Sequence, residues 1–118
     1  MRHKTKQVIL HMLEYIRRIE IMIDGCTREQ FIDNFEKNMA VSLAIQNIGE
    51  LSKELPDGLK EKYGAIPWAK MVGMRNRAAH GYHTLDLEMV WKTAAEGLTD
   101  LKNALLHEKE MLETATEY

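Results

Sequence analysis

The sequence predicts an all-α fold, an up-and-down bundle of about four helices in a single domain that spans residues 1–118. Apolar side chains recur at intervals of three or four along most of the chain, which is the spacing of one face of an α-helix. No segment alternates apolar and polar residues as a half-buried strand does, and turn residues separate the periodic stretches. Helices joined by short loops pack most simply as antiparallel neighbours.

The first helix is predicted over residues 6–23. Its apolar residues lie on one face and charged residues lie on the other, and Gly25 can adopt the left-handed conformation that closes a helix. The apolar residues are Ile9, Met12, Leu13, Ile16, Ile19 and Ile23.

A second, longer helix is predicted from Thr27 to about Leu55. Thr27 and Gln30 have the spacing of a capping box, and Pro56 stops the helix. The stretch that follows, residues 59–66, is expected to be irregular. The apolar face of this helix is predicted to carry Phe31, Phe35, Val41, Ile45, Ile48 and Leu51.

Two further helices complete the prediction. The third begins at Pro67, which suits a first helical turn, and runs toward His80 with Gly81 as its terminator. The fourth is capped by Asp86. Trp68 and Trp91 have core spacing, so we expect them to pack rather than to stack on bases. The fourth helix has its apolar residues at Leu87, Val90, Trp91, Ala94, Leu98, Leu101, Leu105 and Leu112.

The composition, 45% hydrophobic and 29% charged in 118 residues, is that of a compact domain and argues against disorder. No apolar run approaches the roughly 20 residues that span a bilayer, and Arg17 and Arg18 do not fit a signal peptide. The single cysteine, Cys26, cannot form an internal disulfide. We therefore expect a cytoplasmic protein.

Charge is distributed unevenly. The formal net charge of −2 does not by itself indicate a nucleic-acid-binding protein. Residues 62–84, however, hold Lys62, Lys70, Arg75 and Arg77 and no carboxylate, so this segment is locally positive.

The stretch MRNRAAHGYHTLD, residues 74–86, concentrates polar chemistry in this segment. The imidazole of His80 can exchange a proton with a 2′-hydroxyl or a leaving oxygen near neutral pH. The guanidinium of Arg75 can hold charge on phosphate oxygens. These residue types suit phosphodiester cleavage without a metal.

Spacing leaves the arrangement open. Residues five positions apart on an ideal helix lie roughly 140° apart around its axis. Either the last turn tilts His80 toward Arg75, or the site lies between two copies of the chain across a two-fold axis, which would also supply both an acid and a base. An arginine and a histidine near a helix end are also ordinary partners of the helix dipole, and spacing alone favours that ordinary role.

The run RNRAAHGY, residues 75–82, resembles the R-x-x-x-x-H-x-Y signature of the HepT-type toxins in the HEPN superfamily. The resemblance extends to IGELSKEL from Ile48 and to the run from Ile66 to Trp91. It therefore covers most of the domain.

The resemblance implies an all-α homodimer that acts on RNA as a metal-independent endoribonuclease without a cofactor. Its partner would be a small nucleotidyltransferase antitoxin of the MntA type. Arg75 and His80 would be catalytic, Asn76 would support them, and Tyr82 would be the tyrosine that the antitoxin modifies with AMP.

Other residues have weaker assignments. Lys70, Arg77 and His83 are candidate RNA contacts, although a solvated loop position is the more ordinary role for His83. Gly49 suggests a close helix crossing, and the neighbouring Glu50 is either a surface residue or a salt-bridge partner that orients Arg75.

No metal site is assigned. His107 and Glu110 share a helical face, but they form only half of a carboxylate-bridged site.

A rival hypothesis is a non-catalytic module of the same fold that binds a nucleotide or a partner protein, because a fold does not certify an activity. An ordinary bundle without an active role is a third option. A neighbouring reading frame for a nucleotidyltransferase would favour the toxin.

Overall fold

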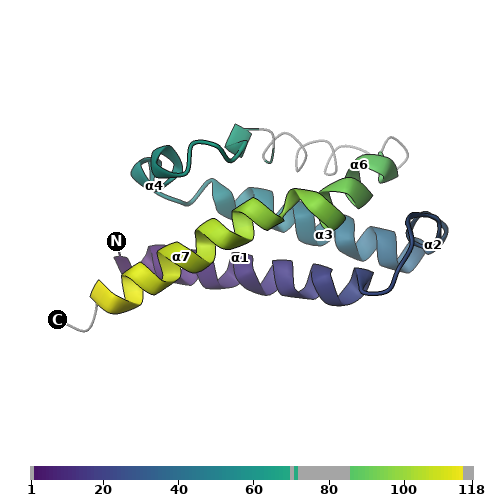
Figure 1. Ribbon diagram of the computed structural model, residues 1–118, viewed down its shortest axis with the longest axis horizontal. Helices are drawn as coiled ribbons and strands as arrows, with labels where there is room; N and C mark the ends of the chain where they lie inside the picture. Colours follow the sequence, from purple (N-terminus) through teal and green to yellow (C-terminus); the bar gives the residue numbers. More distant parts are fainter. Residues whose placement is uncertain (1, 70, 72–85, 116–118) are drawn as a thin grey trace.

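The computed structural model describes residues 2–69, 71 and 86–115, and every regular element in these ranges is helical. Two long antiparallel helices, α1 and α3, lie side by side at the centre, and α7 packs against α1 (Figure 1). The all-α prediction is confirmed, with the main helices packed together. In chain order the elements are α1 (Arg2–Ile23), α2 (Arg28–Asp33), α3 (Phe35–Ser52), α4 (Asp57–Lys62), α6 (Leu87–Lys92), the π-helix η2 (Thr93–Gly97) and α7 (Thr99–Ala115).

The core lies where α1 meets α3 and the chain from α6 to α7. The predicted apolar face of α1 is confirmed, since Ile9, Met12, Ile16 and Ile19 are all buried. Gly25, with φ of 70°, adopts the left-handed conformation predicted for the end of this helix.

The predicted second helix is two helices. The capping box is confirmed, because the Thr27 side chain accepts a hydrogen bond from the Gln30 amide and the Gln30 side chain accepts one from the Thr27 amide. The error lies at Asn34, which has an extended backbone and whose side chain accepts a hydrogen bond from the Lys37 amide at 2.9 Å. Asn34 therefore ends α2 and caps α3.

The break at Asn34 changes what the two phenylalanines do. Phe31 is buried, and the centroid of its ring lies 5.3 Å from the ring centroid of Trp91. Phe35 was predicted on the same apolar face, but it is 74% exposed. The extended backbone at Asn34 interrupts the 3.6-residue periodicity, so Phe35 is no longer aligned with Phe31.

The chain after α3 also differs from the prediction. Helix α3 ends at Ser52 rather than near Leu55, and residues 59–62, expected to be irregular, belong to α4. Pro56 caps α4 with an extended backbone, and Leu59 is buried beneath it. Acidic Asp57 in its first turn and Lys60 and Lys62 in its last turn complement the helix dipole.

The third predicted helix is described only at its start. Residues 68, 69 and 71 are helical, and the Met71 amide donates to the Pro67 carbonyl at 3.1 Å. The predicted course toward His80 and the predicted stop at Gly81 lie outside the described residues.

The fourth predicted helix changes its winding part-way. Asp86 caps α6 as predicted, accepting a hydrogen bond from the Met89 amide. A π-helical segment, Thr93–Gly97, then precedes α7. Val90, Ala94 and Leu98 follow at two intervals of four, each of which rotates an α-helical face by roughly 40°. The wider π turn absorbs this rotation, and all three residues stay buried.

A polar cluster joins the end of α4 to α7. The Tyr63 hydroxyl donates to Glu108 Oε2 at 2.9 Å and lies 2.6 Å from His107 Nδ1, which therefore acts as the donor to Tyr63. Lys62 Nζ lies 3.1 Å from the same Glu108 oxygen. Burial, followed by the hydrogen bond with Glu108, raises the pKa of Tyr63.

Tyr63→Phe is expected to lower the free energy of unfolding by about 1 kcal/mol, because it removes a hydroxyl that bonds to two partners. The raised pKa of Tyr63 means that its contribution is complete below about pH 10 and is lost as the pH rises through the folded-state value. The variant should therefore lose less stability than the wild type between pH 9 and 11. Urea denaturation at several pH values would measure both effects, and identical curves for the two proteins would contradict the assignment.

Candidate functional site

The residues predicted to carry the chemistry lie outside the described part of the chain. The structure describes the residues that come directly before segment 72–85 and directly after it. The predicted site residues are Lys70, Arg75, Asn76, Arg77, His80, Tyr82 and His83.

The entry to this segment is fixed against α3. Pro67 and Met71 share an apolar hollow of about 110 Å³ with Ile48 and Gly49 of α3. Gly49 is buried at this point. The indole of Trp68 donates to the carbonyl oxygens of Lys60 and Tyr63 and packs against the core, so its predicted packing role is confirmed.

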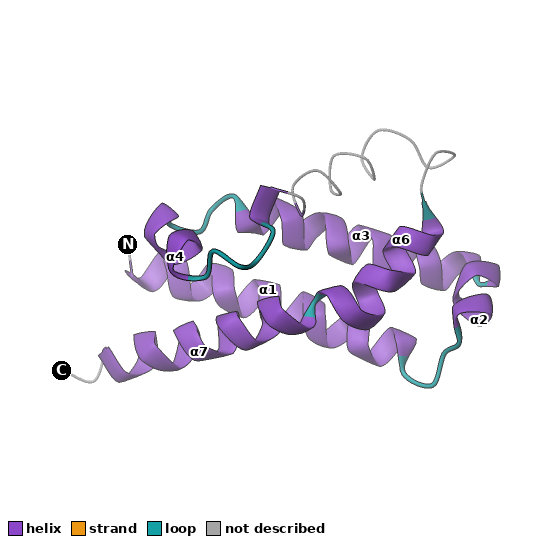
Figure 2. Ribbon diagram, turned by 45° about the horizontal axis from the view of Figure 1, so that its top comes forward, coloured by secondary structure: helices purple, strands orange, loops and turns teal. Residues whose placement is uncertain are grey.

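The exit from the segment is fixed against α2 and α3. Asp86 opens α6, whose Glu88 pairs with Arg28 of α2, with Arg28 Nε donating to Glu88 Oε2 at 2.7 Å. Trp91 of α6 packs on Phe31, as predicted for a core tryptophan. Figure 2 shows α6 crossing beside α3 near α2. Both described ends of the segment are therefore held by rigid helices.

A groove of about 360 Å³ lies between α1 and α3, and polar and charged residues stand along it. Sequence analysis did not single out two of its residues, Tyr15 and Asn47, which lie 32 positions apart and are joined by a hydrogen bond of 3.3 Å from Asn47 Nδ2 to the Tyr15 hydroxyl. Their only sequence signal is that each is a polar side chain at the edge of an apolar face. The full lining is His11, Glu14, Tyr15, Arg18, Asn47, Glu50 and Leu51.

The groove carries both signs of charge. Hydrogen bonds from Arg17, the largest cause, and then from Arg18 hold the pKa of Glu14 below its usual range. Glu50, on the opposite wall, has Lys53 Nζ at 3.8 Å. Glu50 is exposed, as its surface role predicts, and the alternative role as a partner of Arg75 falls on a residue outside the described part of the chain. The groove offers both donors and acceptors to a polar ligand.

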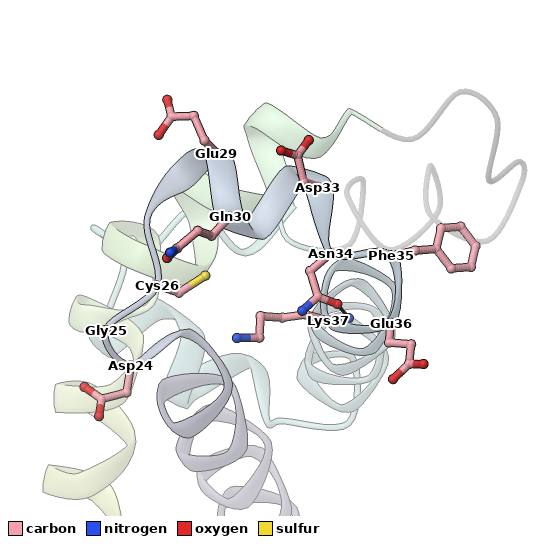
Figure 3. A pocket seen from close by; sticks show the side chains of 10 residues that line it. All are labelled: Asp24, Gly25, Cys26, Glu29, Gln30, Asp33, Asn34, Phe35, Glu36 and Lys37. Carbon is pink, nitrogen blue, oxygen red and sulfur yellow. Dashed lines mark hydrogen bonds between the residues drawn. The ribbon is translucent and has the colours of Figure 1, made fainter.

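A second hollow, of about 810 Å³, surrounds the joint between α2 and α3 (Figure 3). The Lys37 side chain points into it and Phe35 points away from it. Cys26 is half-buried in the wall of this hollow, and its thiol donates to the Thr27 carbonyl. The carboxylates that line this hollow are Asp24, Glu29, Asp33 and Glu36.

No cluster of three or more histidine, cysteine, aspartate or glutamate side chains suited to a metal occurs among residues 2–69, 71 and 86–115. His107, considered with Glu110 in the sequence, bonds instead to Tyr63. Within the same ranges, no helix is long and apolar enough to cross a membrane.

Comparison with known proteins identifies the family. The family model described as ribonuclease HepT-like matches residues 12–107. The chain belongs to the ribonuclease HepT-like family. The match includes residues 75–82, which carry the R-x-x-x-x-H-x-Y signature, and it confirms the family resemblance drawn from the sequence.

Individual relatives agree with this membership of the HepT-like family. A Thermococcus cleftensis protein named "probable ribonuclease HepT" is 32% identical over 86% of this chain and 93% of its own length. A Methanocaldococcus jannaschii protein named "putative RNase" is 33% identical over 82% of this chain and 80% of its own. A Caldanaerobacter subterraneus protein of the same description is 26% identical over 87% and 89%. No solved structure matches the chain at a significant level.

Proposed function

We propose that this protein is the toxin of a type VII-like toxin–antitoxin pair, a metal-independent endoribonuclease that acts in the cytoplasm. The observation that carries the proposal is the R-x-x-x-x-H-x-Y run at residues 75–82, which lies inside the span matched by the ribonuclease HepT-like family. The lack of any carboxylate between Lys62 and Thr84 further supports an anionic substrate.

The proposed reaction is an internal transesterification. His80 of one copy removes the proton from a ribose 2′-hydroxyl, whose oxygen attacks the adjacent phosphorus. The bond from phosphorus to the 5′-oxygen breaks, and His80 of the second copy donates a proton to that oxygen. The products are a 2′,3′-cyclic phosphate and a 5′-hydroxyl, and no cofactor takes part.

The remaining residues of the segment support this step. Arg75 holds the non-bridging phosphate oxygens as charge develops on them. Asn76 supports Arg75 and His80 by hydrogen bonding. Lys70, Arg77 and His83 contact the RNA backbone, which places the positive charge of the segment along the substrate.

The active unit is proposed to be a homodimer. One histidine per chain cannot serve as base and acid in the same in-line displacement, and a two-fold axis supplies the second. The fixed entry at Pro67 and Met71 and the fixed exit at Asp86 support such a shared site, because reacting groups must be held to within a fraction of an ångström.

The direct test is RNA cleavage by the purified chain in EDTA. A labelled RNA should yield fragments with 2′,3′-cyclic phosphate ends at a rate unchanged by the chelator. Absence of cleavage, with binding of a nucleotide or partner protein retained, would favour the non-catalytic module instead.

Control by a nucleotidyltransferase antitoxin is proposed to act at Tyr82. Addition of AMP to its hydroxyl would place a negatively charged phosphodiester seven residues from Arg75 along the chain, where it can compete for the guanidinium that holds the scissile phosphate. Such a modification blocks cleavage by occupying the site and needs no unfolding.

Tyr82→Phe is therefore expected to prevent modification while leaving cleavage largely intact. Incubation of the wild-type chain with the antitoxin, ATP and magnesium should add one or more AMP masses and stop cleavage. Intact-mass and peptide mapping would measure the adduct, and Tyr63→Phe, which keeps Tyr82, serves as the matched control. An adduct on Tyr82→Phe, or an adduct mapped to another residue, would refute this role.

A further inference from the structure

Tyr63 directly follows α4, and its side chain is held by two adjacent residues of α7. The Tyr63 hydroxyl donates a hydrogen bond to Glu108 Oε2 at 2.9 Å and lies 2.6 Å from His107 Nδ1. The rings of Tyr63 and His107 also meet edge to face, with their centroids 6.2 Å apart. These contacts join the end of α4 to a helix that lies more than 40 positions further along the chain.

The backbone of Tyr63 binds the residues that lead toward segment 72–85. Its carbonyl oxygen accepts a hydrogen bond from the Ile66 amide at 3.1 Å and another from the Trp68 indole at 3.2 Å. The same indole N–H lies 3.1 Å from the Lys60 carbonyl oxygen in the last turn of α4. The loop that follows α4, drawn in teal in Figure 2, is therefore tied to the end of that helix.

Trp68 connects this loop to the start of the segment. Its side chain packs against the core, and the Met71 amide donates to the Pro67 carbonyl at 3.1 Å. Met71 is the last described residue before the segment and is four positions before Arg75 in the sequence. Because packed side chains transmit displacements instead of absorbing them, a shift of Tyr63 is expected to reach the start of the segment.

The hydrogen bond to Glu108 is shielded from water. The Glu108 side chain is 15% exposed, whereas Glu20, which pairs with Lys102 between α1 and α7, is 47% exposed. A hydrogen bond to a carboxylate is stronger than one between neutral groups, and partial burial strengthens it further. Exposed ion pairs contribute little. Glu108 is therefore better suited than Glu20 to fix the position of a neighbouring element.

We propose that Tyr63 and Glu108 are positioning residues of the proposed ribonuclease, through which α7 fixes the chain that enters segment 72–85. They act through the Trp68 indole and not by contact with the RNA. The proposal rests on the proposed function. Cleavage is sensitive to such a shift, because misplacement of a reacting group by about 1 Å can reduce the rate about a hundredfold.

The kinetic test compares two glutamates that each link α7 to another element. Glu108→Ala removes the acceptor of the Tyr63 hydroxyl, and it should lower kcat at least about fivefold while KM stays within about twofold, because positioning affects the reacting geometry more than RNA affinity. Glu20→Ala is the matched control, since it removes the same charge from another lysine pair, and it should leave kcat and KM unchanged. Cleavage of a labelled RNA in EDTA, at a temperature where every variant is folded, measures both constants.

Two conservative variants separate positioning from a loss of charge. Glu108→Gln keeps an oxygen that can accept from the Tyr63 hydroxyl, so its kcat should lie within about twofold of the wild-type value. Tyr63→Phe keeps the ion pair of Lys62 and Glu108 but lacks the hydroxyl, and it should lower kcat as Glu108→Ala does. Urea denaturation of each variant shows whether the kinetic losses follow stability.

A second measurement follows Trp68 directly and needs no RNA. The chain has two tryptophans, so its nitrogen-15 NMR spectrum should contain two indole N–H signals, which the spectrum of Trp91→Phe assigns. Tyr63→Phe and Glu108→Ala should move the Trp68 signal, because this N–H donates to the Tyr63 carbonyl. The signal of Trp91, which packs on α2, should stay in place and serves as an internal control. Glu20→Ala should move neither signal.

The other outcomes overturn different statements. Wild-type kcat in Glu108→Ala and Tyr63→Phe, or an unmoved Trp68 signal in both, would overturn the positioning role and leave the proposed ribonuclease standing. A loss of kcat that Glu20→Ala shares, or that Glu108→Gln does not relieve, would assign the effect to charge or stability and would also overturn this role. Absence of cleavage by the wild-type chain would overturn the proposed function and the positioning role together.

Discussion

His80→Ala is expected to reduce RNA cleavage by at least about a thousandfold, because the substitution removes the proton acceptor in one copy and the proton donor in the other. General acid–base catalysis typically contributes 10²- to 10⁴-fold for a single transfer. Arg75→Ala removes a donor to the charge that develops on the phosphate, for which a loss of about 10²- to 10³-fold is expected. Both losses should appear mainly in kcat, since the groups act most strongly on the transition state.

The measurement is single-turnover cleavage of a labelled RNA in EDTA, with thermal unfolding of each variant measured beside it. His3→Ala provides a matched control, since His3 is an exposed histidine at the start of α1, and its cleavage rate should stay at the wild-type value. Cleavage by His80→Ala within tenfold of the wild type would show that the proton transfers belong to another residue.

Ile19→Ala is expected to lower the free energy of unfolding by about 2–5 kcal/mol, because it removes buried methyl groups and leaves a cavity that the core fills only in part. Ile19 lies on α1 with 0% of its surface exposed, where the helix meets the core. A loss of this size is a large share of the 5–15 kcal/mol that stabilises a typical domain.

Ile21→Ala is the matched control on the same helix. Ile21 is two positions further along α1 and is 60% exposed, and alanine is the better helix former, so the free energy of unfolding should change by less than about 0.5 kcal/mol. Urea denaturation at one fixed protein concentration compares the pair even if the chain dimerises. Equal losses for the two variants would mean that α1 does not bury the face that contains Ile19.

The sequence by itself determined the features that depend on neighbouring residues. The capping box of Thr27 and Gln30, the stop at Gly25 and the cap at Asp86 were all predicted, because the hydrogen bonds and backbone angles concerned involve residues within a few positions of one another. The family was also evident from a short motif, residues 75–82, whose spacing is read directly from the chain.

The tertiary structure alone decided which of several local options prevailed. Asn34 can sit in a helix or cap one, and here it caps α3 while Asn38 Nδ2 donates to the carbonyls of Phe31 and Ile32 at the end of α2. The exposure of Phe35 follows from that break. The π turn at Thr93–Gly97 likewise keeps Ala94 and Leu98 buried at spacings that an α-helix would rotate away.

Contacts between residues far apart in the chain could not be predicted from the sequence. Tyr15 meets Asn47 across 32 positions and Tyr63 meets His107 across 44, and nothing near either residue indicates its partner. Such pairs form only once apolar burial has set the relative positions of whole helices, since a hydrogen bond contributes about 1 kcal/mol and the burial of several large side chains contributes far more. Periodicity and capping thus specify where helices form, while packing specifies which of their faces meet.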